Sequence, residues 1–250
     1  MINREDLAAL DKADPLANLH DRFELPDGVI YLDGNSLGPL PKNVPARVAE
    51  VVQRQWRDDL IRSWNIHDWD RLPLSVGDRI APLIGAGPGE VLVGDSTSVN
   101  LFKLMAAALE LRPERKVIVS QSGNFPTDIY LAEGLIRQLG DGHELRLVDG
   151  DDVLGAIDDD VALVSLTQVD YRSGHLQEMA NVTHRAHDAG ALMLWDLSHS
   201  AGVMTVDLAG AGADFAVGCS YKYLNGGPGA PAYLYVARHL QDQMRQPLSG

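Results

Sequence analysis

Residues 219–229 read Cys-Ser-Tyr-Lys-Tyr-Leu-Asn-Gly-Gly-Pro-Gly, which places Lys222 between two tyrosines. An apolar run at 215–217 precedes this stretch, and a glycine-rich turn ends it. Lysine is rarely buried in a protein unless another group pairs with it. A half-buried lysine can act as a nucleophilic amine and form a Schiff base. A lone lysine in such a place is more often solvated at a strand end. A second motif is therefore needed to distinguish a Schiff-base lysine from a solvated one.

The second motif lies upstream at 191–199, Ala-Leu-Met-Leu-Trp-Asp-Leu-Ser-His, where an apolar strand ends at Asp196. Pyridoxal phosphate chemistry needs a lysine that holds the aldehyde as an imine. It also needs an aspartate that keeps the pyridine nitrogen protonated, so that the ring accepts electrons from a substrate carbanion. Asp196 and Lys222, at the ends of two successive strands, therefore predict an enzyme that uses pyridoxal 5'-phosphate (PLP).

These motifs resemble those of the kynureninase family, in particular Trp-Asp-Leu-Ser-His-Ser at 195–200 and the stretch around Lys222. Matching segments run along essentially the whole chain. The resemblance implies an α/β fold, PLP fold type I (aspartate aminotransferase-like), with a mainly parallel sheet and helices on both faces. It further implies PLP-dependent hydrolysis of the Cβ–Cγ bond of L-kynurenine to anthranilate and L-alanine, in tryptophan catabolism.

A phosphate site is predicted at 91–98, Val-Leu-Val-Gly-Asp-Ser-Thr-Ser, which reads as a strand followed by hydroxyl residues at the start of a helix. Hydroxyl residues at this position commonly cap the helix. The free N–H groups and the dipole of a helix N-terminus also bind anions. Capping alone is the commoner meaning, but the Lys222 motif requires a phosphate site, and Thr97 and Ser98 are the residues expected to form it.

The resemblance assigns roles to several residues. Lys222 holds the cofactor and takes the Cα proton, Asp196 keeps the ring cationic, and Tyr221 donates a proton and contacts the phosphate. Phe125 stacks on the ring, with core packing as its alternative role, and Asp128 lies near the pyridine side. The catalytic residues are thus Lys222, Tyr221 and Asp196. The predicted cofactor-binding residues are Thr97, Ser98, Phe125, Asp128, Thr167, Asp196, His199, Tyr221 and Lys222.

Two residues are predicted to contact the substrate by resemblance. They are Ser36, within Gly-Asn-Ser-Leu-Gly at 34–38, and Trp64. From the sequence alone, Ser36 equally fits a surface loop, and Trp64 fits a cap on the core. An apolar wall at Trp64 would leave an added hydroxyl buried and unpaired, at a cost of ~1–3 kcal/mol. We therefore expect L-kynurenine to be preferred over 3-hydroxykynurenine, the second candidate substrate.

Strands and helices alternate from 91 to 236, which predicts a mainly parallel sheet. The expected strands lie at 91–93, 117–119, 144–148, 161–167, 191–196, 215–217 and 232–236. Ligands bind at the carboxyl ends of such strands. The residues that fall at these ends are Thr97, Phe125, Thr167, Asp196 and Lys222.

The chain is expected to divide into an N-terminal segment, 1–45, that contributes to the active site, and a large PLP-binding domain, 46–250. A helix is expected at 44–62, with its valines at 44, 48, 51 and 52 turned inward. The resemblance implies a further small carboxyl-terminal domain that supplies the arginine for the substrate carboxylate. Nothing in the 250 residues clearly replaces that arginine. We therefore expect this chain to bind PLP weakly and not to cleave kynurenine at a useful rate.

Composition limits the partners. The chain has 250 residues, 45% of them hydrophobic, which suffices for one large core. Its net charge of −14 disfavours nucleic acid and anionic membranes. A single cysteine, Cys219, fits a reducing cytoplasm. No metal site is predicted, because the His-x-x-His at 184–187 lacks further ligands. The expected partners are a small-molecule substrate and, by resemblance, a second copy in a homodimer.

Two alternatives remain at this point. A cysteine desulfurase or class V aminotransferase would share the fold, but a desulfurase needs a nucleophilic cysteine on a mobile loop. Cys219 lies three residues before Lys222 at a strand end, where burial is the better expectation. A non-catalytic PLP-binding fragment is the alternative outside enzymes, and a protein without imine absorbance would favour it.

Overall fold

Within residues 3–140, 142–150 and 152–248, which the computed structural model describes, seven strands form one large sheet. Their order across the sheet is β3-β9-β8-β7-β6-β4-β5. The strands are β3 (Val91–Val93), β4 (Val117–Gln121), β5 (Glu144–Val148), β6 (Val161–Thr167), β7 (Leu192–Asp196), β8 (Phe215–Gly218) and β9 (Tyr233–Val236). β9 is antiparallel to both of its neighbours, and the other pairs are parallel. The prediction of a mainly parallel sheet is confirmed.

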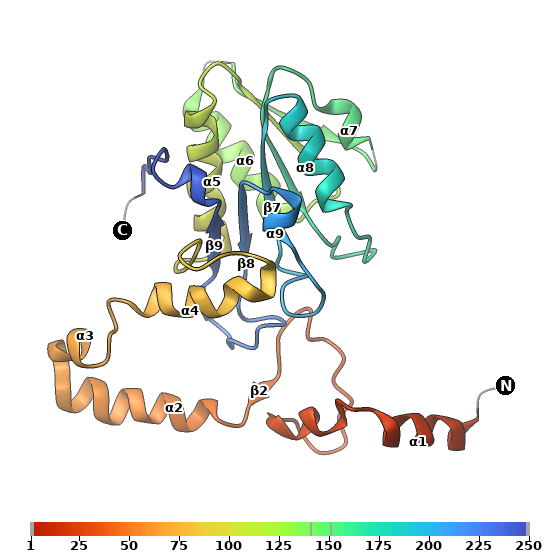
Figure 1. Cartoon of the computed structure of the whole chain (residues 1–250), viewed down its shortest axis with the longest axis vertical. Helices are drawn as coiled ribbons and strands as arrows, with labels where there is room; N and C mark the ends of the chain where they lie inside the picture. The colour runs from red at the N-terminus through yellow and green to blue at the C-terminus, as the bar shows by residue number, and fades with distance from the viewer. Residues whose placement is uncertain (1–2, 141, 151, 249–250) are drawn as a thin grey trace.

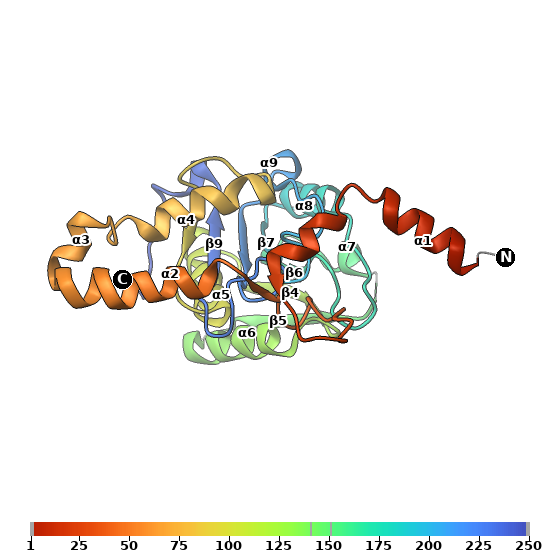
Figure 2. The same ribbon diagram turned by 90° about the horizontal axis from the view of Figure 1, so that it is seen from below.

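Helices cover both faces of this sheet (Figure 1). One face packs against α5 (Thr97–Leu111) and α6 (Pro126–Leu139). The opposite face packs against α4 (Leu72–Ile80), the 3-10 turn Ala81–Ile84, α7 (Val153–Ala156), α8 (Met179–Asp188) and α9 (Leu208–Ala211). The view from below shows the strands between these two helix layers (Figure 2). A 3-10 turn, Arg238–Leu240, follows the last strand.

The two central strands show why the sequence adopts this arrangement. Every residue of β6 and of β7 is buried. Near-continuous apolar runs of this kind are typical of parallel strands covered on both faces. Trp195 is fully buried in β7, and its indole N–H donates to Thr183 Oγ1 of α8 at 3.2 Å. The strand bounds predicted at 144–148 and 161–167 match β5 and β6.

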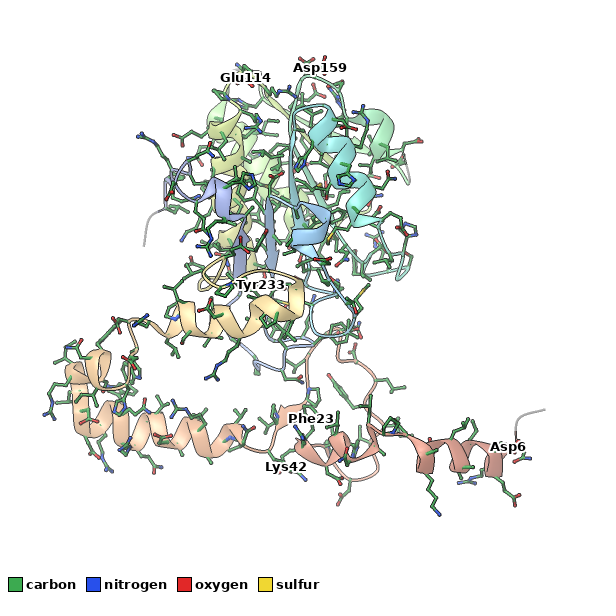
Figure 3. All side chains as sticks on the ribbon, in the orientation of Figure 1. Asp6, Phe23, Lys42, Glu114, Asp159 and Tyr233 are labelled. Carbon is green, nitrogen blue, oxygen red and sulfur yellow. The ribbon has the colours of Figure 1, made fainter. Side chains whose placement is uncertain are left out.

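The N-terminal arm, residues 3–71, extends away from the sheet (Figure 1). Its elements are α1 (Arg4–Ala13), the 3-10 turn Ala17–Arg22, β1 (Phe23–Glu24), β2 (Leu40–Pro41), α2 (Val44–Glu50), the π-helical segment Val51–Asp59, the 3-10 turn Leu60–Arg62 and α3 (Ser63–Ile66). Many of the arm's side chains project into solvent (Figure 3). The predicted domain limits at residues 1 and 250 lie outside the described residues.

The predicted inward face of the 44–62 helix is wrong for two of its valines. Val48 is 54% exposed and Val52 is 47% exposed. The buried side chain of this helix is instead Gln55, which donates to Glu50 and accepts from the Trp69 indole N–H. The physical reason is that the helix lies on the arm and has no sheet beneath it. Within the described ranges, no helix combines the length and apolarity needed to cross a membrane.

Candidate active site

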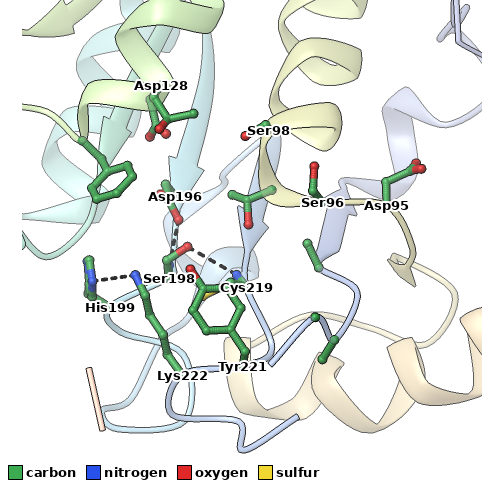
Figure 4. A pocket seen from close by; sticks show the side chains of 16 residues that line it. Asp95, Ser96, Ser98, Asp128, Asp196, Ser198, His199, Cys219, Tyr221 and Lys222 are labelled. Carbon is green, nitrogen blue, oxygen red and sulfur yellow. Dashed lines mark hydrogen bonds between the residues drawn. The ribbon is translucent and has the colours of Figure 1, made fainter. Parts of the chain in front are cut away.

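A cavity of about 440 Å³ opens at the carboxyl edge of the sheet (Figure 4). It is lined by the β3–α5 loop, the first turn of α6, the end of β7 and the loops that follow β7 and β8. β7 and β8 are parallel neighbours, with Asp196 opposite Val217, so both chains leave the sheet over the same edge. Eight predicted site residues line the cavity: Thr97, Ser98, Phe125, Asp128, Asp196, His199, Tyr221 and Lys222.

Lys222 enters the cavity from the loop after β8 and is only 8% exposed. Its Nζ lies 2.8 Å from Nε2 of His199. The Nζ also lies over the rings of Phe125 and Tyr221, 5.6 and 5.8 Å from their centroids, at distances typical of cation–π contacts. The amine is thus held by an imidazole and aromatic faces, which leaves it accessible to a carbonyl group in the cavity.

His199 is a neutral partner for this amine. Burial lowers the pKa of His199, and the neighbouring charge of Lys222 lowers it further. A neutral imidazole has one acceptor nitrogen, which fits the short contact with Nζ. The other nitrogen, Nδ1, is buried and has no hydrogen-bond partner among the described residues.

Two aspartates face each other at the far wall. Asp196 ends β7, is 5% exposed, and accepts a hydrogen bond from the Ser198 N–H at 2.7 Å. Asp128, in the first turn of α6, is 4% exposed. Burial raises the pKa of Asp128 to about 9, helped by the charge of Asp196. At neutral pH, Asp128 therefore carries a proton while Asp196 supplies the negative charge of this wall.

The N-terminus of α5 forms the opposite end of the cavity. Ser96 caps the helix, because its hydroxyl accepts from the Val99 N–H at 3.2 Å. The N–H groups of the first turn have no partner within the helix, and Thr97 and Ser98 of this turn line the cavity. Such a helix end is suited to a phosphate.

The residues present fit PLP on two observations. Asp128 Oδ2 is buried without a hydrogen-bond partner among the described residues, which suits a ring N–H donor. The buried amine of Lys222 and the α5 N-terminus lie on other walls of the same cavity, where an aldehyde and a phosphate would be needed.

Cys219 and Tyr221 complete the wall beside Lys222. Cys219 is a buried free thiol whose pKa is raised by burial. Burial also raises the pKa of Tyr221, so its phenol keeps its proton at neutral pH. A buried, protonated thiol is a poor nucleophile, which weighs against Cys219 as a desulfurase cysteine.

Three predicted site residues do not line this cavity. Thr167 is buried at the end of β6, but its hydroxyl donates to Asn124 Oδ1. Ser36 is exposed in the arm. Trp64 is 50% exposed on α3. For Thr167 the strand end was placed correctly, and the direction of the side chain was not readable from the sequence.

Some residues of the cavity were missed. Asp95, Thr127 and Ser198 line it. Ser198 follows Asp196 by two positions, a spacing at which an aspartate often accepts from the backbone, and this signal could have identified it. Tyr171 stands beside the cavity, with its ring 5.2 Å from Phe125 and 6.5 Å from His199.

The arm contacts the lysine loop directly. The Gly38 N–H donates to the Tyr221 carbonyl at 2.9 Å, and the Asn225 side-chain amide donates to the Pro39 carbonyl at 3.0 Å. Asn225 has a φ of +58°, a left-handed conformation that asparagine tolerates. Its own N–H donates to the Lys222 carbonyl at 3.0 Å. Residues 33–39 therefore fix the backbone that carries the amine.

We expect Gly38→Ala to disrupt this contact. An added Cβ would overlap the carbonyl oxygen of Lys222 and touch the Asn225 amide, so the loop has to move, at a cost of about 1–3 kcal/mol or more. Gly34→Ala is the matched control, because its Cβ would meet the Tyr223 ring at an ordinary 3.6 Å. Thermal unfolding and PLP titration of both variants test this. Equal behaviour of the two would show that the contact does not hold the lysine loop.

The geometry and the family comparison agree on the class of protein. Residues 75–250 match the aminotransferase class-V family, and the chain belongs to it. The fold is shared with a cysteine desulfurase from Escherichia coli, with a TM-score of 0.74 at 17% identity over 94% of this chain and 61% of that one.

The proteins whose sequences are more similar to this chain are kynureninases. A kynureninase of Burkholderia pseudomallei (strain 1106a) is 54% identical over 255 aligned positions, and one of Pseudomonas fluorescens is 52% identical. Both alignments cover all of this chain. The chain spans about 61% of the length of these relatives.

Proposed function

We propose that the chain is the cofactor-binding part of a PLP-dependent hydrolase that cleaves the Cβ–Cγ bond of L-kynurenine, giving anthranilate and L-alanine. The observation that carries the proposal is the placement of Lys222, Asp196 and the α5 N-terminus around one cavity. The identity of 52–54% to kynureninases supports the choice of substrate. The arm contact at Gly38 supports the proposed division into a segment 1–45 that serves the site and a PLP-binding domain 46–250.

Four residues would hold the cofactor at its two ends. Thr97 and Ser98 would bind the phosphate with their N–H and hydroxyl groups, and Asp196 and Asp128 would meet the ring nitrogen. When bound, PLP supplies an aldehyde that reacts with amines and a ring that accepts electrons. Phe125 lines the same cavity and would cover one face of the ring.

The chain's own groups would then move protons. Lys222 Nζ, once released by the substrate amine, would take the proton from the substrate Cα. His199 Nε2, 2.8 Å away, would position this amine and accept its hydrogen bond. Tyr221 keeps its phenolic proton because burial raises its pKa, and this proton is available for donation to the carbon released by cleavage.

Exposed apolar side chains on the arm support a homodimer. Val52, Trp56, Ile61 and Trp64 are 47, 63, 77 and 50% exposed. All four lie between positions 52 and 64 of the arm, and large exposed apolar patches often mark protein–protein interaction sites. In a dimer, Trp64 and Ser36 would serve as substrate contacts although neither lines the cavity of its own chain. A cytoplasmic location is part of the proposal, supported by the single, buried, free Cys219.

The proposal is tested by mixing the purified protein with PLP and L-kynurenine, and recording imine absorbance and anthranilate fluorescence. The Pseudomonas fluorescens kynureninase serves as positive control. We expect imine absorbance and, where anthranilate forms, a higher kcat/KM for L-kynurenine than for 3-hydroxykynurenine. A colourless protein would favour the non-catalytic alternative, and sulfide released from L-cysteine would favour a desulfurase. A marked preference for the hydroxylated substrate would contradict the aryl pocket at Trp64.

A further inference from the structure

The cavity has an excess of acidic groups for a site that takes a phosphate. Three aspartates line it, Asp95, Asp128 and Asp196, and in the described part of the chain Lys222 is the one lysine or arginine among its lining residues. A phosphate monoester adds about 1.5–2 negative charges at neutral pH. The anion is therefore bound only if some of these carboxyl groups are neutralised.

Asp128 and Asp95 lie at different ends of the cavity (Figure 4). Asp128 is neutral at pH 7 because burial raises its pKa to about 9. Asp196 and Lys222 offset one another in charge. Asp95 remains, and it directly precedes Ser96, the N-cap of α5. A carboxylate here is a local anion next to the N–H groups that would bind the phosphate.

Lys103 of α5 pairs with Asp95. Its Nζ lies 2.8 Å from Asp95 Oδ2, and its side chain is 13% exposed, against 42% for Asp95. Figure 4 shows the Asp95 carboxylate turned away from Asp196 and Lys222. The backbone of Asp95 is fixed, because its carbonyl accepts from the Ala232 N–H and the Gly94 N–H donates to the Ala232 carbonyl, both at 2.9 Å. Only the Asp95 side chain is then free to turn.

We propose that Lys103 is a positioning residue for the cofactor phosphate: it neutralises Asp95 and holds its carboxylate away from the N-terminus of α5. The inference rests on the PLP site proposed above. Without Lys103, the Asp95 carboxylate is unpaired and competes with the phosphate for the N–H groups of the first turn. Because Asp95 is 42% exposed, solvent screens the repulsion between its unpaired carboxylate and the phosphate, and we expect binding to weaken on the order of tenfold.

The test is a double-mutant cycle on the purified protein that removes each charge separately and both together, with Lys103→Met, Asp95→Asn and the double variant. Lys12→Met, on exposed α1, is the matched control for loss of a lysine charge. Dissociation constants are measured at low salt for PLP and for pyridoxal, which has the aldehyde and ring but no phosphate. We expect Lys103→Met to weaken PLP binding about tenfold, with pyridoxal binding and the Lys12→Met variant unchanged. The double variant should regain parental PLP affinity within about twofold.

A merely structural role for Lys103 predicts a different pattern. The double variant would then bind PLP no better than Lys103→Met, and pyridoxal binding would fall as well; either result overturns the inference. Asp95→Asn alone tests it even if Lys103→Met fails to fold, since the inference expects PLP affinity equal to or above that of the parent, and a tenfold loss contradicts it. A parent protein that binds no PLP would instead refute the proposed function.

Discussion

Replacing Lys222 by alanine is expected to abolish covalent attachment of PLP and to reduce any anthranilate release that the parent shows by at least about 10³-fold. The reason is that one amine is proposed both to hold the cofactor and to move the Cα proton, and general acid–base catalysis alone contributes roughly 10²–10⁴-fold. Lys222→Arg distinguishes the effect of the positive charge from that of imine formation, because a guanidinium keeps the charge but does not form the imine. Both variants should therefore lack the imine absorbance.

Borohydride reduction of the parent with bound PLP identifies the amine directly. After digestion, mass spectrometry should find the label on the peptide that contains Lys222, the lysine that lines the cavity. A label on Lys103 or Lys116 would refute the assignment. The same digest of the Lys222→Arg variant is the control, and it should carry no specific label.

Asp196→Asn is expected to reduce any turnover that the parent shows by about 10²–10³-fold, with a much smaller effect on PLP affinity. The amide has nearly the same shape but no negative charge, so it does not stabilise a proton on the ring nitrogen. Asp128→Asn is the matched control on the same wall. Because Asp128 is already protonated at pH 7, with a pKa of about 9, an amide resembles its working form and turnover should fall far less. Equal losses in the two variants would contradict the assigned roles.

The protonated state of Asp128 can also be tested through the pH dependence of stability. The folded-state pKa of Asp128, about 9, lies above its ordinary value of 3.8, so between these values the folded protein binds a proton that the unfolded chain has released. For the cofactor-free protein, this group lowers the free energy of unfolding as pH rises from about 4 to about 9, by at most about 1.4 kcal/mol per pH unit. Asp128→Asn removes this contribution. Its Tm should exceed that of the parent at pH 8 by more than at pH 5, and an unchanged difference would contradict the protonated state.

Periodicity and residue type predicted the sheet well, because β6 and β7 are buried along their whole length and almost entirely apolar, which is typical of central strands covered on both faces. The helix at 44–62 shows what periodicity does not predict, namely which face of a helix is buried. Val48 and Val52 have the apolar spacing of a core helix, but this spacing does not show whether the helix packs against another part of the same chain. In the structure it packs against no sheet, so both valines are exposed on the arm.

The candidate site was predicted in part for similar reasons. Asp196 and Lys222 follow strands whose ends the pattern locates, so their meeting followed from topology. The neutral state of Asp128 depends on its burial beside Asp196, and the pairing of Asp95 with Lys103 depends on how the β3–α5 loop turns back on the helix. Both are properties of packing, which a list of residue types does not contain.

The contact between the arm and the lysine loop has a consequence for biosynthesis. Pro39 and Asn225 are 186 positions apart. At about 5–20 residues per second, the ribosome needs roughly 10–40 s to make the chain between them. Throughout that interval residues 33–39 have no docking partner, and Gly38, which is buried in the folded chain, stays exposed to chaperones and to other nascent chains. Loop closure over such a distance is slow and comes late in folding. The amine proposed to capture the cofactor is therefore fixed in place only after residues 33–39 and the loop at 222–225, which are synthesised far apart in time, have met.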